Sequence, residues 1–534
     1  MANIIQPTTH LGEVHGKIEN GVSKFLGIKY ATLKNRLADA ELVERRDGGV
    51  LDATQDGPTA ISPLGGCDLE LSAIQHTLPR KELTQSDVDC LNLNIAVPAD
   101  TPAYSKLPVF VFIHGGGLMI GANSWPQSDL KRFTKLSIDN SLPIVAVAIN
   151  YRLGLFGFLT STELRRAGYK ANNGLRDQKV ALEWVHRHIG DFGGDPNNIT
   201  VAGMSAGAVS LTFHLDSERP LFKRAILMSG SQFFVQALPY DAHEDNYRQA
   251  MSALGLEDAT PEERIKVLLN TPGQDLLAKL PPSALTAPAV DGDMVLSATY
   301  AQVADPTSDI PKGKSWCEKL LIGDAQHDTS ILAVIMPHLK EACATRFVKA
   351  INSVFPLQPD IMTRILTVYG LTAETPDDEA FSAVLAYLND IFISAPTLAY
   401  ARGWKGNAYV YYFNEENPWE GPWRGKASHV LDVAYLFQNF QEFMIPDQEK
   451  IGTAFAVDFF KFCHGTEPWP AIMDGNIGNE FTARVYGPSS EGYTVDQVTQ
   501  PHGGHSKRRS TLFGLSDTVS LDELARVATL FLTT

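Results

Sequence analysis

The chain has 534 residues, of which 44% are hydrophobic and 20% charged, and its formal net charge is −16. This composition is typical of a folded globular protein, and the negative charge argues against nucleic acid as a partner, because phosphate binding needs a basic surface. A dense basic run near the C-terminus is expected to be a solvated loop: Lys507, Arg508 and Arg509.

The N-terminal segment lacks a basic stretch followed by a sustained apolar run, and nowhere do about 18 apolar residues follow one another. We therefore expect a cytoplasmic protein with no secretory signal and no transmembrane segment. The five cysteines lack the spacing of a metal site, so we expect free thiols, no metal and no cofactor: Cys67, Cys90, Cys317, Cys343 and Cys463.

The first predicted element is an antiparallel ribbon. Apolar residues nearly alternate through GEVHGKIENGVSKFLGIKY (12–30), and Asn20 and Gly21 suit the positive φ angles of a tight hairpin turn. Strands covered on both faces lose alternation, so a mainly parallel central sheet is predicted from six later apolar runs: PVFVFI (108–113), PIVAVAI (143–149), ITVAG (199–203), RAILMSG (224–230), KLLIG (319–323) and AYVYYF (408–413).

Helices are predicted around this sheet. In the segment LRDQKVALEWVHRHIGDFGG (175–194) apolar residues recur at helical spacing until two glycines end the pattern. Two further helical zones, about 240–300 and 330–400, interrupt the strand series without a Pro/Ser-rich linker. We therefore predict one α/β domain over residues 1–534, with large helical insertions.

The stretch NNITVAGMSAGAVS (197–210) predicts a nucleophile. A buried-type strand ends at Gly203, Ser205 follows, and small residues then begin a helix. This strand, sharp turn and helix place a serine hydroxyl in the open, with the helix N-terminus directed at developing negative charge. The alternative interpretation is a serine in an ordinary tight turn, which would not require a strand before it and a helix after it.

A glycine-rich loop directly follows the first strand of the series. The letters HGGG (114–117) place three glycines at the carboxyl end of a strand, where α/β sheets bind ligands. Glycines let the backbone approach a substrate carbonyl and present N–H donors. We expect the N–H groups of Gly116, Gly117 and Ala206 to form an oxyanion hole; an ordinary glycine-rich loop is the alternative.

Longer motifs resemble the type B carboxylesterase/lipase family. They extend over most of the chain: FLGIKYA (25–31), DCLNLNI (89–95), NYRLGLFGF (150–158), the block from Asn172 to Gly207, LLIGDAQHD (320–328) and GKASHVLDVAYLF (425–437). The resemblance implies an α/β-hydrolase fold that acts on carboxylic esters through a serine, an acid and a histidine in that chain order.

The base must follow the acid in the chain, which leaves five histidines: His338, His429, His464, His502 and His505. Only His429 follows the last strand-like run at a suitable distance, and it also matches the histidine of the family. Asp324 and Asp328 both follow the strand LLIG as candidate acids, and the resemblance selects Asp328. The resemblance also implies that Ser229 hydrogen-bonds the acid and that Asp432 supports His429 from behind.

Departures from the family bear on the substrate. Many members carry a glutamate before the nucleophile, where this chain has Met204, and no tryptophan lies between Cys67 and Cys90. Choline-like substrates are therefore disfavoured. The segment 67–90 is expected to be a mobile flap over the site, and a Cys67–Cys90 disulfide is conceivable but not expected in a reducing cytosol.

Apolar residues near the catalytic turns are expected to line the substrate pocket: Leu118, Met119, Met204, Phe233 and Phe234. The sequence thus predicts a serine hydrolase that cleaves small neutral esters with apolar or aromatic groups through an acyl-enzyme. Two alternatives remain open. One is an acyltransferase or lactone-forming enzyme that uses the same triad, and the other is an inactive adhesion or scaffold protein, although such proteins usually lack a triad residue.

Overall fold

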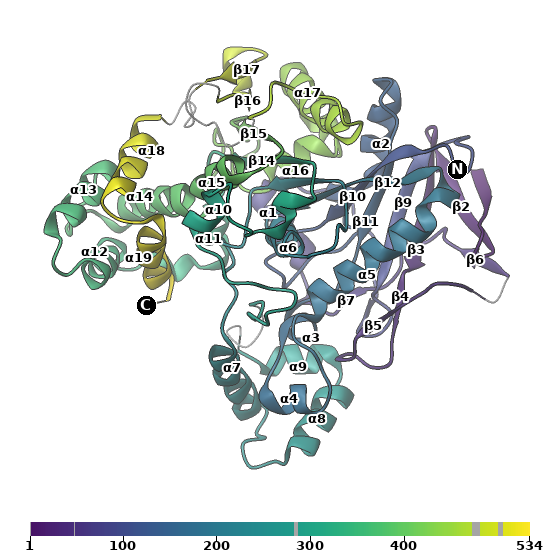
Figure 1. Ribbon diagram of the computed structural model, residues 1–534, viewed down its shortest axis with the longest axis horizontal. Coiled ribbons are helices and arrows are strands. Elements are labelled where there is room, and N and C mark those ends of the chain that lie inside the picture. Colours follow the sequence, from purple (N-terminus) through teal and green to yellow (C-terminus); the bar gives the residue numbers. More distant parts are fainter. Residues whose placement is uncertain (1, 47–48, 282–286, 473–480, 500–505, 534) are drawn as a thin grey trace.

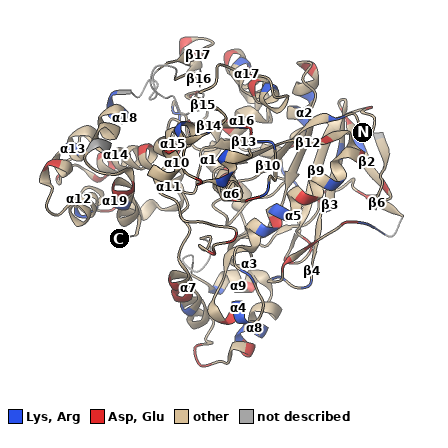
Figure 2. Cartoon of the chain, in the orientation of Figure 1, with Lys and Arg blue, Asp and Glu red and all other residues tan. Residues whose placement is uncertain are grey.

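A computed structural model of the chain describes residues 2–46, 49–281, 287–472, 481–499 and 506–533. Figure 1 shows a large twisted sheet surrounded by helices, with a group of helices extending from its lower edge. Acidic and basic residues are interspersed along the chain, as on the surface helix α5 (Asn173–His188), which carries both signs (Figure 2).

Among the described residues, thirteen strands form one sheet in the order β1-β2-β3-β9-β11-β10-β12-β13-β14-β15-β16-β17, with β6 paired to β2. The strands from β11 to β16 are parallel, whereas the pairs at both ends are antiparallel. Their bounds are β1 Ala2–Pro7, β2 Glu13–Glu19, β3 Val22–Lys29, β6 Val50–Asp52, β9 Asn92–Pro98, β10 Leu107–Ile113, β11 Val145–Ile149, β12 Gly194–Met204, β13 Arg224–Met228, β14 Lys319–Ala325, β15 Asn407–Phe413, β16 Ala483–Tyr486 and β17 Val495–Val498.

The predicted fold class is confirmed. Each of the six apolar runs is a strand of the parallel region, and Asn20 and Gly21 have φ angles of 53° and 78° in the turn of the N-terminal ribbon. The largest difference from the predicted bounds is in β12, which begins at Gly194 instead of residue 199.

Two cores explain why the strand sequences do not alternate. Along β10, Val109, Val111 and Ile113 face one core, whereas Phe110 and Phe112 face the other. Helices α5 and α6 (Ala206–His214) cover the first face, and α2 (Leu130–Asp139) and α17 (Pro446–Cys463) cover the second. Both faces of the strand therefore need apolar side chains.

Helices fill the two predicted insertion zones. The first zone contains α7 Tyr240–Ala253, α8 Pro261–Asn270, α9 Gly273–Lys279 and α10 Tyr300–Ala304. The second contains α11 Ser330–Ile335, α12 Cys343–Val354, α13 Pro359–Tyr369, α14 Asp377–Asn389 and α15 Ala395–Gly403. The division into a core and insertions stays a prediction, since no comparison with known proteins bears on it.

The remaining helices are α1 Gly66–Ile74, α3 Gly154–Phe158, α4 Thr162–Arg166, α16 Leu431–Leu436, α18 Ser506–Phe513 and α19 Leu521–Thr533. The continuous helical run Asp377–Gly403 is long and apolar enough to cross a membrane, but 78% of its most apolar window is buried in the fold. It resembles the core helix of a globular protein in this respect.

All five cysteines are buried free thiols, so Cys67 and Cys90 form no disulfide.

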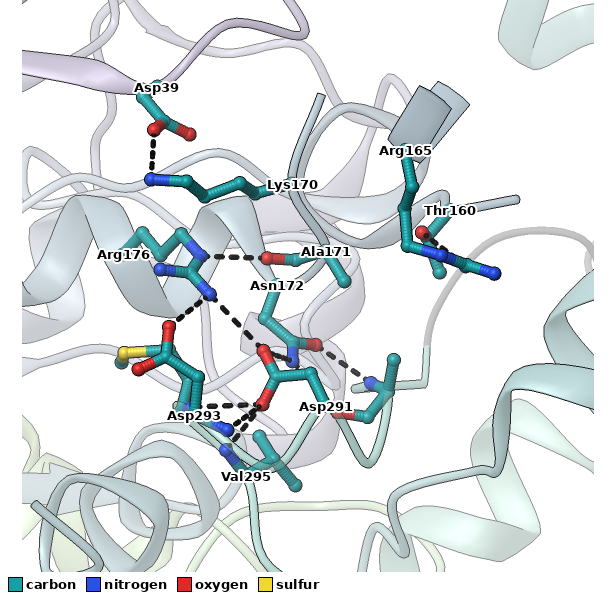
Figure 3. Close-up of polar contacts among 12 residues, drawn as sticks. Asp39, Thr160, Arg165, Lys170, Ala171, Asn172, Arg176, Asp291, Asp293 and Val295 are labelled. Carbon is teal, nitrogen blue, oxygen red and sulfur yellow. Dashed lines mark hydrogen bonds and ion pairs between the residues drawn. The ribbon is translucent and has the colours of Figure 1, made fainter. Parts of the chain in front are cut away.

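One side chain fastens the first insertion zone to the core. Asn172 Nδ2 donates to the carbonyl of Ala289 at 2.8 Å and to Asp291 at 2.9 Å, and its Oδ1 accepts the N–H of Ala289 at 2.7 Å (Figure 3). Arg176 of α5 binds Asp291 and Asp293 from the other side. Because Asn172 and Asp291 are buried, these contacts are protected from water.

We expect Asn172→Ala to lower the free energy of unfolding by about 2–4 kcal/mol, since three buried hydrogen bonds are lost and alanine must adopt a φ of 61°. Asp293→Ala removes only an exposed ion pair and should cost less than about 1 kcal/mol. Chemical unfolding of both variants checks this difference. Equal losses would contradict the role given to Asn172.

Candidate active site

Ser205 lies in a strained turn between β12 and α6. Its φ and ψ angles are 53° and −121°, and its N–H donates to the carbonyl of Met228 at 2.9 Å. A Cβ atom on Gly203 would lie 2.3 Å from the Gly207 carbonyl oxygen, and one on Gly207 would lie 2.1 Å from the Ile113 carbonyl oxygen. Only glycine fits at these two positions, because any side chain would strike the backbone.

Three distant parts of the chain meet at this turn. Ser205 Oγ and His429 Nε2 are 2.9 Å apart, and His429 Nδ1 and Asp328 Oδ1 are also 2.9 Å apart. This geometry suits an imidazole whose Nδ1–H donates to the carboxylate while Nε2 accepts the serine hydroxyl. Ser205 is 8% exposed, whereas His429 and Asp328 are 2% and 0% exposed, so the pair behind the serine is shielded from water.

Backbone contacts hold the acid and the histidine. Asp328 Oδ2 accepts the N–H of Ala325 at 2.8 Å, and the His429 N–H donates to Ser330 Oγ at 2.9 Å. The segments that carry them are joined by a hydrogen bond from His327 N–H to the carbonyl of Ala427. These bonds fix the distance between the carboxylate and the imidazole.

The structure separates the two candidate acids. Asp324 does not hydrogen-bond His429; it accepts a hydrogen bond from Ser394 at 2.7 Å and lies 3.7 Å from Arg509. Burial raises the pKa of Asp324 to about 6, and the nearby Asp328 charge adds to this, while Arg509 opposes it. Asp328 is therefore the carboxylate positioned to orient the imidazole.

The expectation of a solvated basic loop at 507–509 is wrong. These residues lie on α18, where Lys507 is exposed but Arg509 is 1% exposed. Arg508 and Arg509 both donate to the buried Asp390, at 2.7 to 2.9 Å. The partner is more than a hundred residues away in the chain, so the basic run alone could not reveal the ion pair.

The other candidate histidines lie elsewhere. His338 is exposed on a short 3₁₀ turn, and His464 hydrogen-bonds the carbonyl of Pro143 at the end of α17. His502 and His505 fall outside the described residues.

Ser229 and Asp432 form the layer behind the histidine. Ser229 Oγ donates to Asp432 Oδ2 at 3.3 Å, so the expected bond from Ser229 to the catalytic acid is corrected to Asp432. Burial raises the pKa of Asp432 to about 7, and the charge of Asp328 raises it further, whereas His429 lowers it. The two carboxylates lie near the same histidine, and the Ser229 hydroxyl is directed at Asp432.

The glycine loop after β10 is shaped to present backbone donors. Gly116 and Gly117 have φ angles of 93° and 63°, and a Cβ atom on Gly116 would lie 2.2 Å from the Ile120 carbonyl oxygen. Ala206 is the first residue of α6, so its N–H has no partner within the helix. Among the described residues, no protein acceptor is recorded for these three N–H groups.

His114 supports the glycine loop as a neutral side chain. Its ring stacks on Tyr151 with centroids 4.5 Å apart, and the Tyr151 hydroxyl donates to the His114 carbonyl at 3.0 Å. Burial lowers the pKa of His114 to about 4, so it carries no charge at neutral pH. This histidine is therefore part of the scaffold of the loop.

The five predicted pocket residues do not lie together. Phe234 is half-buried, and its ring meets that of His429 edge to face with the centroids 6.1 Å apart, while Met204 packs against Gly115 beside Ser205. Leu118 is fully buried in the core, and Met119 packs against the helices of the first insertion zone.

The last of the five, Phe233, stacks on Tyr300 at 3.9 Å and lines a separate cavity of about 410 Å³. Phe234 and Met204 are therefore the two that remain candidates for substrate contact. Helical or strand spacing could not distinguish them, because all five are apolar and lie within a few residues of a turn at the end of a strand.

A charged residue in this region was not foreseen from the sequence. Glu70 lies on α1, within the segment expected to form the flap, and Gln127 Nε2 donates to its Oε1 at 2.8 Å. Its only sequence signal is its position at helical spacing among buried residues of α1.

Within the described parts of the chain, no group of three or more His, Cys, Asp or Glu side chains is placed to hold a metal ion.

Comparison with known proteins agrees with this geometry. The model of the family described as "Carboxylesterase family" matches residues 4–463. Para-nitrobenzyl esterase of Bacillus subtilis (strain 168) is 28% identical over 524 residues, covering 95% of this chain and 98% of that protein. Lipase 3 of Yarrowia lipolytica (strain CLIB 122 / E 150) is 27% identical over 480 residues, covering 87% and 89%.

The fold is also that of solved esterases. A structure titled thermophylic PNB esterase superposes with a TM-score of 0.74 at 25% identity, covering 96% of this chain and 100% of that one. The resemblance inferred from the motifs is thereby confirmed. The chain belongs to the carboxylesterase family and is a carboxylic ester hydrolase.

Proposed function

We propose that the protein hydrolyses carboxylic esters through an acyl-enzyme on Ser205. The observation that supports this most directly is the unbroken line of contacts from Ser205 Oγ through His429 to Asp328, each 2.9 Å long. Ser205 Oγ attacks the ester carbonyl carbon, and His429 Nε2 takes the hydroxyl proton. Collapse of the tetrahedral intermediate breaks the C–O bond, and His429 returns the proton to the leaving alcohol.

Deacylation repeats these steps with water. His429 takes a proton from the water, the resulting hydroxide attacks the acyl carbon, and Ser205 leaves with the proton from His429. The buried Asp328 holds the imidazole in the correct tautomer and stabilises the imidazolium formed in both halves. The N–H groups of Gly116, Gly117 and Ala206 are the proposed donors to the oxyanion, a role that requires no reorganisation because the backbone is already fixed.

We further propose that the preferred substrates are neutral esters with apolar or aromatic groups. Met204 and Phe234 are the apolar side chains beside the serine and the histidine, and a thioether next to the nucleophile gives a cationic leaving group no partner. An acyl-enzyme of this kind could also transfer its acyl group to an alcohol or amine. Product analysis with and without such an acceptor distinguishes transfer from hydrolysis.

We expect Ser205→Ala to abolish turnover of p-nitrophenyl esters without changing the melting temperature by more than a few degrees, because the hydroxyl contacts only the histidine. His429→Ala should lose activity to within about tenfold of the serine variant, since the members of a triad act as one unit. Steady-state kinetics and thermal melting check both. Residual turnover near the wild-type rate in either variant would contradict the proposal.

Asp328→Asn should lower kcat by roughly 10³ to 10⁴, because the amide favours the wrong histidine tautomer. Asp324→Asn should cost less than about tenfold, since Asp324 contacts Ser394 and Arg509 and not the imidazole. The ratio of the two kcat values measures the assignment. A larger loss at Asp324 would mean that the acid has been misassigned.

Phe234→Ala should raise KM for esters with long or aromatic acyl groups by about fivefold to thirtyfold, through lost apolar contact. The matched control is Phe233→Ala, which should lower stability by roughly 3 kcal/mol through the lost Tyr300 contact while changing KM little. A panel of p-nitrophenyl esters of increasing acyl length, combined with unfolding curves, checks the contrast. The assignment of Phe234 fails if both variants show the same KM.

A further inference from the structure

The inward face of α1 contains one carboxylate. Four of the five buried residues of this helix recur at helical spacing, Gly66, Cys67, Leu71 and Ile74, and the fifth is Ala73. Glu70 stands at the centre of this stripe, whereas Asp68, on the opposite face, is exposed and pairs with Arg80. A charge within an apolar stripe costs free energy, so its retention calls for a compensating interaction.

Helix α1 lies between the two loops that complete the active site. At one end, a Cβ atom on Gly66 would lie 3.0 Å from the Ile120 side chain, next to the glycine loop. At the other end, Asn417 Nδ2 donates to the carbonyl of Ile74 at 2.9 Å and to Ser428 Oγ, beside the histidine, at 3.3 Å. The middle of the inward face is therefore directed toward the space between the oxyanion donors and His429.

A fully buried glutamine fixes the direction of this carboxylate. Gln127 Nε2 donates to Glu70 Oε1 at 2.8 Å, and Gln127 Oε1 lies 3.8 Å from Cys67 Sγ on the same helix. Burial raises the pKa of Glu70, while its attraction to the His429 imidazole and the Gln127 hydrogen bond oppose that rise. Glu70 makes no hydrogen bond or ion pair with His429 in the described part of the chain, so its charge acts on the imidazole through space.

We propose that Glu70 is a positioning residue that stabilises the protonated His429 formed during catalysis, acting from the flap helix. This role rests on the proposed acyl-enzyme function. The negative charge assigned to this role comes from α1, where Gln127 holds the Glu70 carboxylate, whereas the residue before Ser205 is the apolar Met204.

Other titratable groups must be separated from Glu70 in any pH experiment. Those that face His429 are Asp328 after β14, Asp432 on α16 and Glu70 on α1. The groups nearest Glu70 do not change charge between pH 5 and 9, because burial raises the pKa of Cys67 to about 11 and raises that of Tyr151. His114, stacked on Tyr151, has its pKa lowered by burial to about 4. Asp432 differs from these groups, because burial raises its pKa to about 7.

The test is the pH profile of Glu70→Gln with a neutral p-nitrophenyl ester, so that attraction of a charged substrate plays no part. The amide still accepts the hydrogen bond of Gln127 but carries no charge. Removing a negative charge disfavours the imidazolium, so the acid limb of kcat/KM should move to lower pH by about half a unit. We expect kcat to fall about threefold to tenfold with KM unchanged.

Two further variants complete the experiment. Asp68→Asn removes a charge from the exposed face of the same helix and should leave the profile unmoved, because that charge is screened by water. Glu70→Asp should restore the acid limb toward its wild-type position. A Glu70→Gln limb that coincides with wild type, or a uniform loss at every pH, would overturn the proposal and indicate a purely structural role.

Covalent labelling of Ser205 distinguishes the two levels of inference. If wild-type Ser205 is acylated and the Glu70→Gln limb does not move, only the role of Glu70 fails. If wild-type Ser205 is never acylated, the proposed function fails, and with it the reason for assigning Glu70 to the site.

Discussion

The close approach between the start of α6 and the end of β10 is the constraint on which the rest of the site depends. Gly207 and the Ile113 carbonyl are so near that no side chain fits between them. Because β10 and β12 are neighbours with Ile113 opposite Gly203, Ser205 and the glycine loop emerge side by side from one edge of the sheet. The serine and the proposed oxyanion donors are thus brought together by strand register.

The charges around the histidine form a second level of organisation. Asp328 touches the imidazole, Asp432 lies behind it, and Asp324 is balanced separately by Arg509. Buried like charges raise the free energy of one another, so each carboxylate needs its own partner. Because Asp324 and Asp432 have partners of their own, Asp328 is the carboxylate that hydrogen-bonds His429.

Short sequence patterns predicted the parts of the site whose geometry is set by neighbouring residues in the chain. Apolar runs fixed the strands, and the glycines around Ser205 marked a turn that only glycine can form. Contacts between segments that are distant in the chain could not be predicted from such patterns. The burial of Arg509 depends on its ion pair with Asp390, and the partner of Ser229 depends on which of two carboxylates faces it. Glu70 was not predicted, because one glutamate in a helix does not indicate a functional role until the position of that helix near the site is known.

The central claim is that Ser205 carries the acyl group during turnover. The most direct measurement is rapid acid quenching of the protein during turnover of a p-nitrophenyl ester, followed by peptide mass spectrometry. The account predicts that the peptide spanning Ser205 gains the mass of the acyl group, with fragment ions placing it on the serine. An acyl group found on another residue, or turnover without any acylated peptide under conditions in which deacylation limits the rate, would contradict the account.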